Sequence, residues 1–348
     1  RGNREFVIRS YDWRRYPGGS GRIQDFVDAS CSSGMDYPMK TVSIVTPCFN
    51  EVENVEELYR RVRGVFEGLG AYDYEHIFID NASTDGTVGA IKALAASDKR
   101  VKLIVNVRNF GHIRSPIHAM MQARGDAVVF MAADLQDPPE LLEAFIAKWE
   151  AGYKAVVGTK RTSEETLAMA LIRRLYYRVV GNISEVRLIP DYTGFGLYDR
   201  EMVEAIRNID DPYPYFRGLI AELGYECATV PYEQKSRRRG VTKNNFYTLY
   251  DIAMLGITSH SKVPLRLATM LGFSLGFLSL VVSCAYLVLK LYYWEQFSLG
   301  MAPLLIGVFF FASIQLFFIG ILGEYIGAIH TQVLKRPMVV ERERVNFD

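Results

Sequence analysis

The sequence has few of the residues that mark a disulfide-stabilised or zinc-binding protein. Its 348 residues include four cysteines and five histidines. No two cysteines have C-x-x-C spacing, and no two histidines have the H-E-x-x-H spacing of a zinc site. These absences predict reduced thiols in a cytosolic setting and argue against a disulfide framework or a zinc motif.

An excess of charge of either sign is also missing. There are 40 Lys and Arg residues against 39 Asp and Glu residues, so the formal net charge is +1. A dedicated nucleic-acid-binding protein should carry a basic excess, and we therefore predict no nucleic-acid partner. Hydrophobic residues at 49% and charged residues at 23% instead indicate a globular chain and exclude a disordered one.

Long apolar runs are absent from the first two-thirds of the chain, but two occur after residue 264. Leu267–Leu289 has no charged residue over 23 positions, and Gln296–Gly323 has none over 28. At about 1.5 Å per helical residue, either segment is long enough to cross a hydrocarbon core of roughly 30 Å. We predict two transmembrane helices in the segment 264–330, at about 265–290 and 299–323, which form a hairpin.

Basic residues orient this hairpin. Lys and Arg residues are concentrated before the first span and after the second, whereas the connector holds only Lys290. The positive-inside rule then places both ends of the hairpin in the cytoplasm, together with a cytosolic tail at 331–348. Apolar residues also recur at helical spacing between Asn245 and Ile257. This pattern predicts a juxtamembrane helix within 241–263 that lies in the membrane interface, or alternatively one that packs on the soluble domain.

The segment 1–38 is aromatic and rich in arginine, without clear periodicity. It has no apolar stretch of the kind found in a secretory signal, and none is predicted. Met35 and Met39 are plausible native start residues, so we assign no function to this N-terminal extension.

Residues 39–240 read as an α/β domain. Apolar and β-branched runs alternate with helical patterns, which predicts a parallel, doubly wound sheet with helices on both faces. The predicted strands are 41–46, 74–79, 101–105, 127–132 and 155–158, and the predicted helices are 54–69, 87–96, 115–123 and 138–150.

Acidic residues follow three of the predicted strands. Glu51, Asp80 and Asp134 come just after the first, second and fourth strands. Ligands of such sheets bind at the carboxyl ends of the strands, so these side chains should converge on one edge. No Walker A or G-x-G-x-x-G sequence occurs at these turns, which argues against an NTPase or a dinucleotide enzyme.

Two further acidic residues have a structural interpretation. Asp85 precedes Gly-Thr and is placed to cap the second helix, and Asp137 before Pro138 fits an N-cap with proline at the first helical position. Asp80 could also cap a turn. A carboxylate at the end of an apolar strand, as at Asp134, is instead typical of a ligand for a metal bound to a diphosphate.

At these residues the sequence resembles glycosyltransferase family 2 with the GT-A (Rossmann-like) fold. More narrowly, it resembles the polyprenyl-phosphate glycosyltransferases, such as dolichyl-phosphate mannose synthase and the bacterial undecaprenyl-phosphate glycosyltransferases. The resemblance extends from about Thr41 to Lys335. It rests on the order of the strings TPCFNE, IDNASTDGT, RNFGHIRSP, ADLQDPPE, PDYTGFGLYDR, YFRGLIAELGY and RRRGVTK, followed by the hairpin.

The resemblance implies roles for individual residues. Pro47, Glu51 and Asp80 would bind the nucleotide sugar, and Asp134 with Gln136 would bind Mg²⁺ or Mn²⁺ on its diphosphate. Asp134, Asp191 and Arg237 would be catalytic. The acceptor phosphate would be held by Arg161, Arg174, Arg237 and Lys243. Basic residues at an anionic membrane surface are the alternative interpretation for Arg174 and Arg237–Arg239.

Two positions depart from the family pattern. The metal motif of the family is often D-x-D, but here it reads Ala132-Ala133-Asp134, and Asp80-Asn81 replaces the commoner Asp-Asp pair. Because Mg²⁺ often binds through one or two carboxylates plus substrate phosphates, the loss at Ala132 need not abolish metal binding. It could instead shift reliance to Gln136 and Asp137.

The resemblance implies a metal-dependent, inverting sugar transfer to undecaprenyl phosphate. The enzyme would be a multi-pass protein of the bacterial inner membrane with a cytosolic catalytic domain. UDP-glucose is the first choice of donor, because such enzymes commonly supply a glucosyl-phosphate lipid for modifying envelope polysaccharide such as lipopolysaccharide. UDP-galactose, UDP-N-acetylhexosamines, an aminoarabinose donor and GDP-mannose remain open.

Two alternatives to this function are weighed. A processive polysaccharide synthase normally shows a Q-x-x-R-W motif and more spans, and neither is present. A catalytically impaired membrane scaffold that binds nucleotide sugar is supported only by Ala132. Homo-oligomers are common among relatives, and the oligomeric state is left open.

Overall fold

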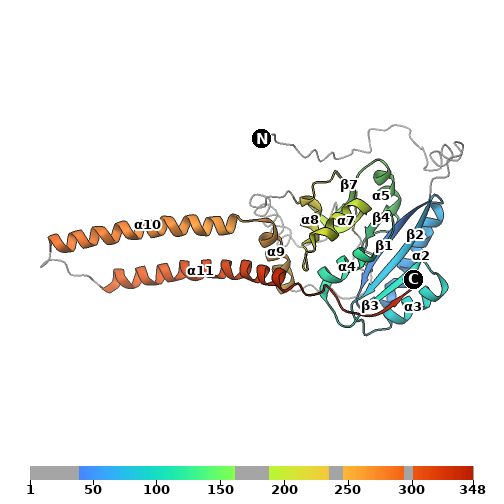
Figure 1. Ribbon diagram of the computed structural model, residues 1–348, viewed down its shortest axis with the longest axis horizontal. Helices are drawn as coiled ribbons and strands as arrows, with labels where there is room; N and C mark the ends of the chain where they lie inside the picture. The colour runs from blue at the N-terminus through green and yellow to red at the C-terminus, as the bar shows by residue number, and fades with distance from the viewer. Residues whose placement is uncertain (1–38, 161–187, 235–245, 294–300, 348) are drawn as a thin grey trace. The chain divides into compact units, whose positions relative to one another are not determined.

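The computed structural model describes residues 39–160, 188–234, 246–293 and 301–347 (Figure 1). These residues fall into two units. One comprises 39–160, 188–234 and 335–347 and contains the sheet, and the other comprises 246–293 and 301–334 and is helical.

The first unit is built on a mixed eight-stranded sheet in the order β7-β5-β6-β4-β1-β2-β3-β8. Neighbouring strands are parallel except where β6 pairs with β4 and β5, and where β8 pairs with β3. The strands are β1 (Lys40–Cys48), β2 (Tyr72–Asp80), β3 (Val101–Asn106), β4 (Ala127–Phe130), β5 (Ala155–Lys160), β6 (Tyr192–Asp199), β7 (Cys227–Tyr232) and β8 (Glu341–Val345).

Helices cover both faces of this sheet, because successive strand residues point to opposite faces and both sets are apolar. Ile44 and Phe78 face one buried cluster, whereas Val45 and Ile77 face the other. The first cluster packs against α2 (Val52–Gly68), α3 (Thr87–Ser97) and α5 (Leu141–Glu150). The second packs against α4 (Gly111–Gln122), α7 (Arg200–Ile209) and α8 (Phe216–Glu222).

The predicted alternation of strands and helices from 41 to 160 is confirmed, with shifts of a few residues at the ends. The sequence did not predict the strand order or the antiparallel strand β6, which lies between β4 and β5. The predicted tail contributes as well, because β8 forms within it and adds an edge strand beside β3.

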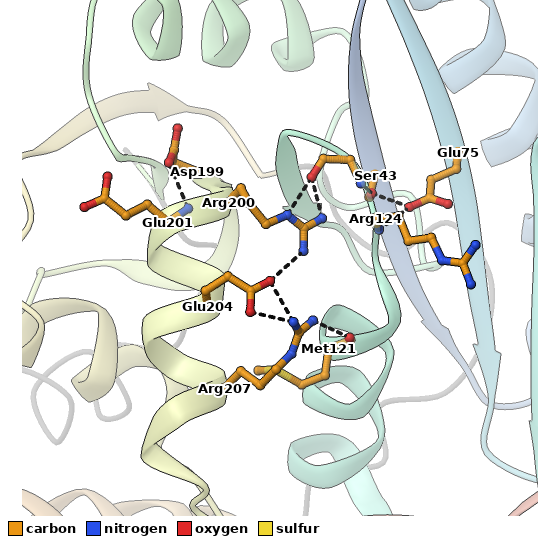
Figure 2. A network of polar contacts seen from close by, with 10 residues as sticks. Ser43, Glu75, Met121, Arg124, Asp199, Arg200, Glu201, Glu204 and Arg207 are labelled. Atoms are coloured by element: carbon orange, nitrogen blue, oxygen red, sulfur yellow. Dashed lines mark hydrogen bonds and ion pairs between the residues drawn. The ribbon is translucent and has the colours of Figure 1, made fainter.

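Polar contacts fasten the amino edge of the sheet (Figure 2). Glu75 in β2 accepts hydrogen bonds from the Ser43 hydroxyl of β1 and from the Arg124 backbone N–H, at 2.5 and 2.7 Å. Arg200 and Arg207 of α7 both pair with Glu204. The Arg200 guanidinium also donates to the Gly125 carbonyl, in the connection between α4 and β4, and that of Arg207 donates to the Met121 carbonyl near the end of α4. These contacts connect four elements at the end of the sheet where the parallel strands begin.

The second unit consists of α9 (Phe246–His260), α10 (Val263–Tyr292) and α11 (Met301–Leu334). The helix predicted near 245–257 is therefore confirmed as a helix, and its place in a membrane interface stays a prediction. Val263–Leu289 and Gly307–Leu334 are long and apolar enough to cross a membrane. The Tyr325 hydroxyl of α11 donates to the Ser261 carbonyl at 2.6 Å, which fixes α11 to the segment between α9 and α10.

Candidate active site

The carboxyl edge of the sheet collects the loops after β1, β2 and β4, and it also receives the start of the antiparallel β6. Four non-glycine residues on these loops have left-handed backbone angles: Asn50, Ala82, Leu135 and Asp191, with φ between 56° and 63°. Such conformations are costly for residues with a side chain, and they cluster at functional sites. The structure thus brings Glu51, Asp80, Asp134 and Asp191 to one edge.

Reciprocal hydrogen bonds join the loops after β1 and β2. The Asn50 N–H donates to the Ser83 hydroxyl at 2.9 Å, and the Asn50 side-chain oxygen accepts from the Thr84 N–H at 2.8 Å. The Glu51 N–H donates to the Thr87 hydroxyl at 2.9 Å. Pro47, which the resemblance places in the nucleotide site, lies half-buried near the end of β1.

Negative charge accumulates around these two loops. Burial, together with the carboxylates of Asp80, Glu51 and Asp85, raises the pKa of the Cys48 thiol well above its usual value. Cys48 is therefore a neutral, packed side chain, and the negative potential around it is a property of the site. The N-cap residue of α3 is Gly86, so Asp85 lies one position before the predicted cap. Its carboxylate still accepts hydrogen bonds from the Thr87 N–H and hydroxyl in the first turn of α3, at 3.0 and 2.5 Å.

Asp80 is completely buried at the end of β2. One carboxylate oxygen, Oδ2, accepts a hydrogen bond from the Ser83 N–H at 2.9 Å, so the side chain does hold a turn. The other, Oδ1, is buried and has no hydrogen-bond partner in the described part of the chain. A buried acceptor without a partner costs about 1–3 kcal/mol, and a ligand that offers a donor removes that cost.

Asn81 explains why an amide replaces the second acidic residue of the family pair. Its side-chain oxygen accepts from the Asn106 amide at 3.0 Å and from the Phe110 N–H at 3.1 Å. Its side-chain nitrogen donates to the Gly111 carbonyl at 2.9 Å. A carboxylate at this position could accept but could not donate to Gly111. Asn81 therefore ties the loop after β2 to the start of α4.

Asp134 lies half-buried beyond the end of β4, and its Oδ1 accepts the Gln136 N–H at 3.2 Å. No group of three or more His, Cys, Asp or Glu side chains suited to a metal occurs within the described ranges. A carboxylate and an amide still fit Mg²⁺ or Mn²⁺, because such ions often keep water ligands and bind jointly to substrate phosphates. The donor set fits an ion shared with a diphosphate and does not form an all-protein cage.

Asp137 does not cap a helix, contrary to the sequence prediction. α5 begins only at Leu141, and Asp137 is buried, with its Oδ1 accepting from the Tyr232 hydroxyl of β7 at 2.5 Å. Burial is the main reason that its pKa rises to about 6, and the nearby Asp134 carboxylate adds to the effect. Asp137 is thus too far before α5 to cap it, and its carboxyl instead attaches the Asp134 loop to β7.

Asp191 directly precedes β6, and its carbonyl accepts the Lys160 N–H from the end of β5 at 3.1 Å. The remaining predicted site residues, Arg161, Arg174, Arg237 and Lys243, lie outside the described residues.

His112, Arg114 and Arg217 also lie at this edge, and no role was predicted for them. His112 and Arg114 lie in the first turn of α4, and Arg217 lies in the first turn of α8. All three belong to the strings RNFGHIRSP and YFRGLIAELGY, which supported the family resemblance without a residue role. Their position in the first turn of a helix, just after a strand or loop, could have identified them as candidate site residues from the sequence.

Comparisons with known proteins agree with this geometry. The family model described as glycosyl transferase family 2 matches residues 43–207. The "Uncharacterized glycosyltransferase sll0501" of Synechocystis sp. is 34% identical over 85% of this chain and 93% of its own length. The "Bactoprenol glucosyl transferase" of Shigella phage SfII is 33% identical over 86% of this chain and 96% of its own.

Among solved structures, mannosyl-3-phosphoglycerate synthase from Rubrobacter xylanophilus is similar with a TM-score of 0.48 and 20% identity, covering 72% of this chain and 79% of that one. The sheet and its loaded carboxyl edge define an α/β enzyme of the GT-A class, and the relatives extend over most of the chain. The chain belongs to glycosyltransferase family 2, and it is a glycosyltransferase.

Proposed function

We propose that this enzyme transfers a sugar, glucose as first choice, from a UDP-sugar to a polyprenyl phosphate of the undecaprenyl type. The buried, unpartnered Oδ1 of Asp80 is the observation that carries the donor half of this proposal. This oxygen can accept a hydrogen bond from an N–H or O–H group of a nucleoside. The acceptor half is supported by the relatives named bactoprenol glucosyl transferases.

The donor lies, on this proposal, along the loops after β1 and β2. Pro47 and Glu51 line the nucleotide, and Asp80 accepts from its base or ribose. The network of Asn50, Ser83 and Thr84 holds these loops together before substrate arrives. Preorganisation of this kind lowers the entropy cost of binding.

Asp134 and Gln136 would hold the divalent metal, which would also bind the donor diphosphate. Such an ion, when bound, acts as a Lewis acid that stabilises negative charge on the departing nucleotide. The Tyr232–Asp137 hydrogen bond attaches this loop to β7 three residues after Asp134.

The acceptor needs orientation more than activation. A phosphate monoester has a second pKa of about 6, so the lipid phosphate is already an oxyanion at neutral pH. A cationic clamp can place it against the anomeric carbon without repulsion from the donor diphosphate. We assign this clamp to Arg161, Arg174, Arg237 and Lys243, with Asp191 on the acceptor side of the site.

A single displacement at the anomeric carbon inverts its configuration. The nucleophile is the phosphate oxygen of the lipid, and a covalent enzyme intermediate is not required. NMR of the lipid-linked sugar should therefore show the anomeric configuration opposite to that of the donor, and a retained configuration would contradict the mechanism.

The reaction itself is tested by nucleotide release from full-length protein in detergent, with Mg²⁺ or Mn²⁺. A panel of UDP- and GDP-sugars is assayed with and without undecaprenyl phosphate. Release that requires both the lipid and one sugar identifies the donor. No release with any donor, from folded protein that binds UDP, would favour the impaired scaffold.

Asp134→Asn should lower turnover at least 100-fold and weaken Mn²⁺ binding measured by electron paramagnetic resonance in the presence of UDP. The matched control is Asp73→Asn, which changes an exposed carboxylate at the opposite end of β2. Wild-type turnover and Mn²⁺ binding in Asp134→Asn would remove this residue from the metal site.

A further inference from the structure

Two arginine side chains at the carboxyl edge, Arg114 and Arg217, have no acidic partner among the described residues, and His112 lies near them. The arginines of the opposite edge differ, because Arg200 and Arg207 share Glu204 (Figure 2). Arg114 and Arg217 are therefore positive charges that no carboxylate of the described chain pairs with.

Contacts with one loop hold the two guanidinium groups in place. The Arg114 guanidinium lies over the Tyr213 ring at 5.2 Å, and that of Arg217 lies near the Tyr215 ring at 5.9 Å. Tyr213 and Tyr215 both belong to the segment between α7 and α8. Cation–π contacts satisfy a face of the guanidinium but leave its N–H groups free to donate.

Arg217 also connects this cluster to the start of β6. Its Nη1 donates to the Tyr192 carbonyl at 3.5 Å, a long hydrogen bond one residue beyond Asp191. The cluster thus lies next to the segment that carries the proposed acceptor-side residue. α4 and α8 pack on the same face of the sheet, and Arg217 is close enough to α4 for its charge to act on His112.

His112 and Arg114 differ in their local environment. Partial desolvation and the positive charge of Arg217 lower the pKa of His112, so its neutral imidazole is favoured and can take part in a hydrogen bond. The Nε atom of Arg114 is buried without a hydrogen-bond partner among the described residues. A buried donor on a charged group is expensive to leave unpaired.

We propose that Arg114 and Arg217, with His112 beside them, bind a phosphoryl group of the substrates at this edge. This inference rests on the proposed function and adds residues that the family resemblance did not supply. The planar guanidinium groups suit phosphate oxygens, and two of them compensate the charge of a phosphate. The phosphoryl group belongs either to the donor diphosphate or to the lipid, and the two sources are separable by experiment.

The test uses full-length protein in detergent with Arg114→Gln, Arg217→Gln and the matched control Arg207→Gln at the opposite edge. UDP affinity is measured by calorimetry with Mg²⁺, and lipid binding is measured with farnesyl phosphate as a short probe. We expect at least tenfold weaker binding of one ligand in both carboxyl-edge variants and less than twofold change in the control. Arg217→Lys should recover part of the loss, because it keeps the charge.

Weakened UDP binding alone assigns the cluster to the donor diphosphate, and weakened farnesyl phosphate binding alone assigns it to the acceptor. Wild-type affinity for both ligands in Arg114→Gln and Arg217→Gln overturns the proposal. Absence of sugar transfer by the wild-type protein would contradict the proposed function, whereas a selective loss of phosphate binding would still support the cluster. Near-UV circular dichroism of each variant establishes that the comparison is made between folded proteins.

Discussion

His76 is a titratable side chain placed where water does not reach. It is completely buried in β2, its Nε2 lies 3.0 Å from the Thr46 hydroxyl, and its ring stacks on Phe78 with centroids 4.0 Å apart. Burial lowers its pKa from 6.5 to about 3. Native His76 is therefore neutral throughout the physiological range.

Because the pKa of His76 differs between the native and unfolded states, the free energy of unfolding depends on pH. Below pH 6.5 the unfolded chain takes up a proton at His76, whereas the native protein does so only near pH 3. Stability is thus fully present above pH 6.5 and falls as the pH drops towards 3, by at most about 1.4 kcal/mol per pH unit. Asp137, with its raised pKa, has the opposite sign: its contribution is present below pH 3.8 and is lost as the pH rises through about 6.

We expect His76→Gln to remove the His76 contribution while keeping a polar group near Thr46. The difference in urea midpoint between wild type and variant, followed by tryptophan fluorescence from pH 7 to 5, should change steadily below pH 6.5. The Asp137 contribution is common to both proteins and cancels in this difference. Parallel pH profiles would show that His76 does not carry the effect.

The acidic residues of the candidate site could be read from the sequence because each directly follows an apolar strand. Glu51, Asp80 and Asp134 need only the rule that parallel strands end at one edge. Arg114 and Arg217 could not be found this way, since their position at this edge depends on how α4 and α8 pack on the sheet. The Asp-Pro pattern predicted that Asp137 caps a helix. This prediction was wrong because the carboxyl instead binds Tyr232, which is distant in the sequence.

At the scale of elements, the close pairing of β1 with the α4–β4 connection depends on Gly125. A Cβ atom there would lie 2.6 Å from the Thr41 carbonyl oxygen and 2.8 Å from the Ser43 backbone nitrogen. Both neighbours are backbone atoms of a central strand, which cannot move without disturbing the register of β1 with β2 and β4. The glycine is required by close approach of two chain segments.

Gly125→Ala should therefore lower the free energy of unfolding by about 1–3 kcal/mol, as other overpacked sites do. Gly89→Ala is the matched control, because a Cβ at that exposed position in α3 meets nothing within 4 Å. The control should be neutral or stabilising by about 0.5–1 kcal/mol, since alanine favours the helix. Equal effects of the two substitutions in urea unfolding would contradict the close-approach argument.

Local patterns were sufficient for the elements up to β5, where each strand is an apolar run bounded by polar loops. They were insufficient for β8, whose sequence ERERV is almost entirely charged. This strand forms because its partners supply counter-charges: Lys92 pairs with Glu343 at 2.7 Å and His118 contacts Glu341 at 2.5 Å. β8 is an edge strand, and edge strands tolerate charged side chains. Its hydropathy therefore does not distinguish it from a polar loop.

At the scale of the whole molecule, the chain passes through the helical unit and then returns to the sheet. Residues 335–340 connect the end of α11 to β8, and β8 pairs with β3, which leads to the loop before α4. Parts of the catalytic unit thus come both before and after the apolar helices in the sequence. If α10 and α11 span the membrane as a hairpin, both covalent connections to the catalytic unit must lie on one side.

That requirement gives a topology prediction. Cysteine introduced at Lys290, near the end of α10, should react with a membrane-impermeant maleimide added to intact bacterial cells expressing the protein. Cysteine introduced at Lys335, between α11 and β8, should react only after the membrane is opened, because it lies on the catalytic side. The parent protein is the control for its own thiols, since Cys48 is buried and Cys284 lies within α10. Labelling of Lys335→Cys in intact cells would place the catalytic unit outside and would contradict both the orientation and a cytosolic nucleotide-sugar donor.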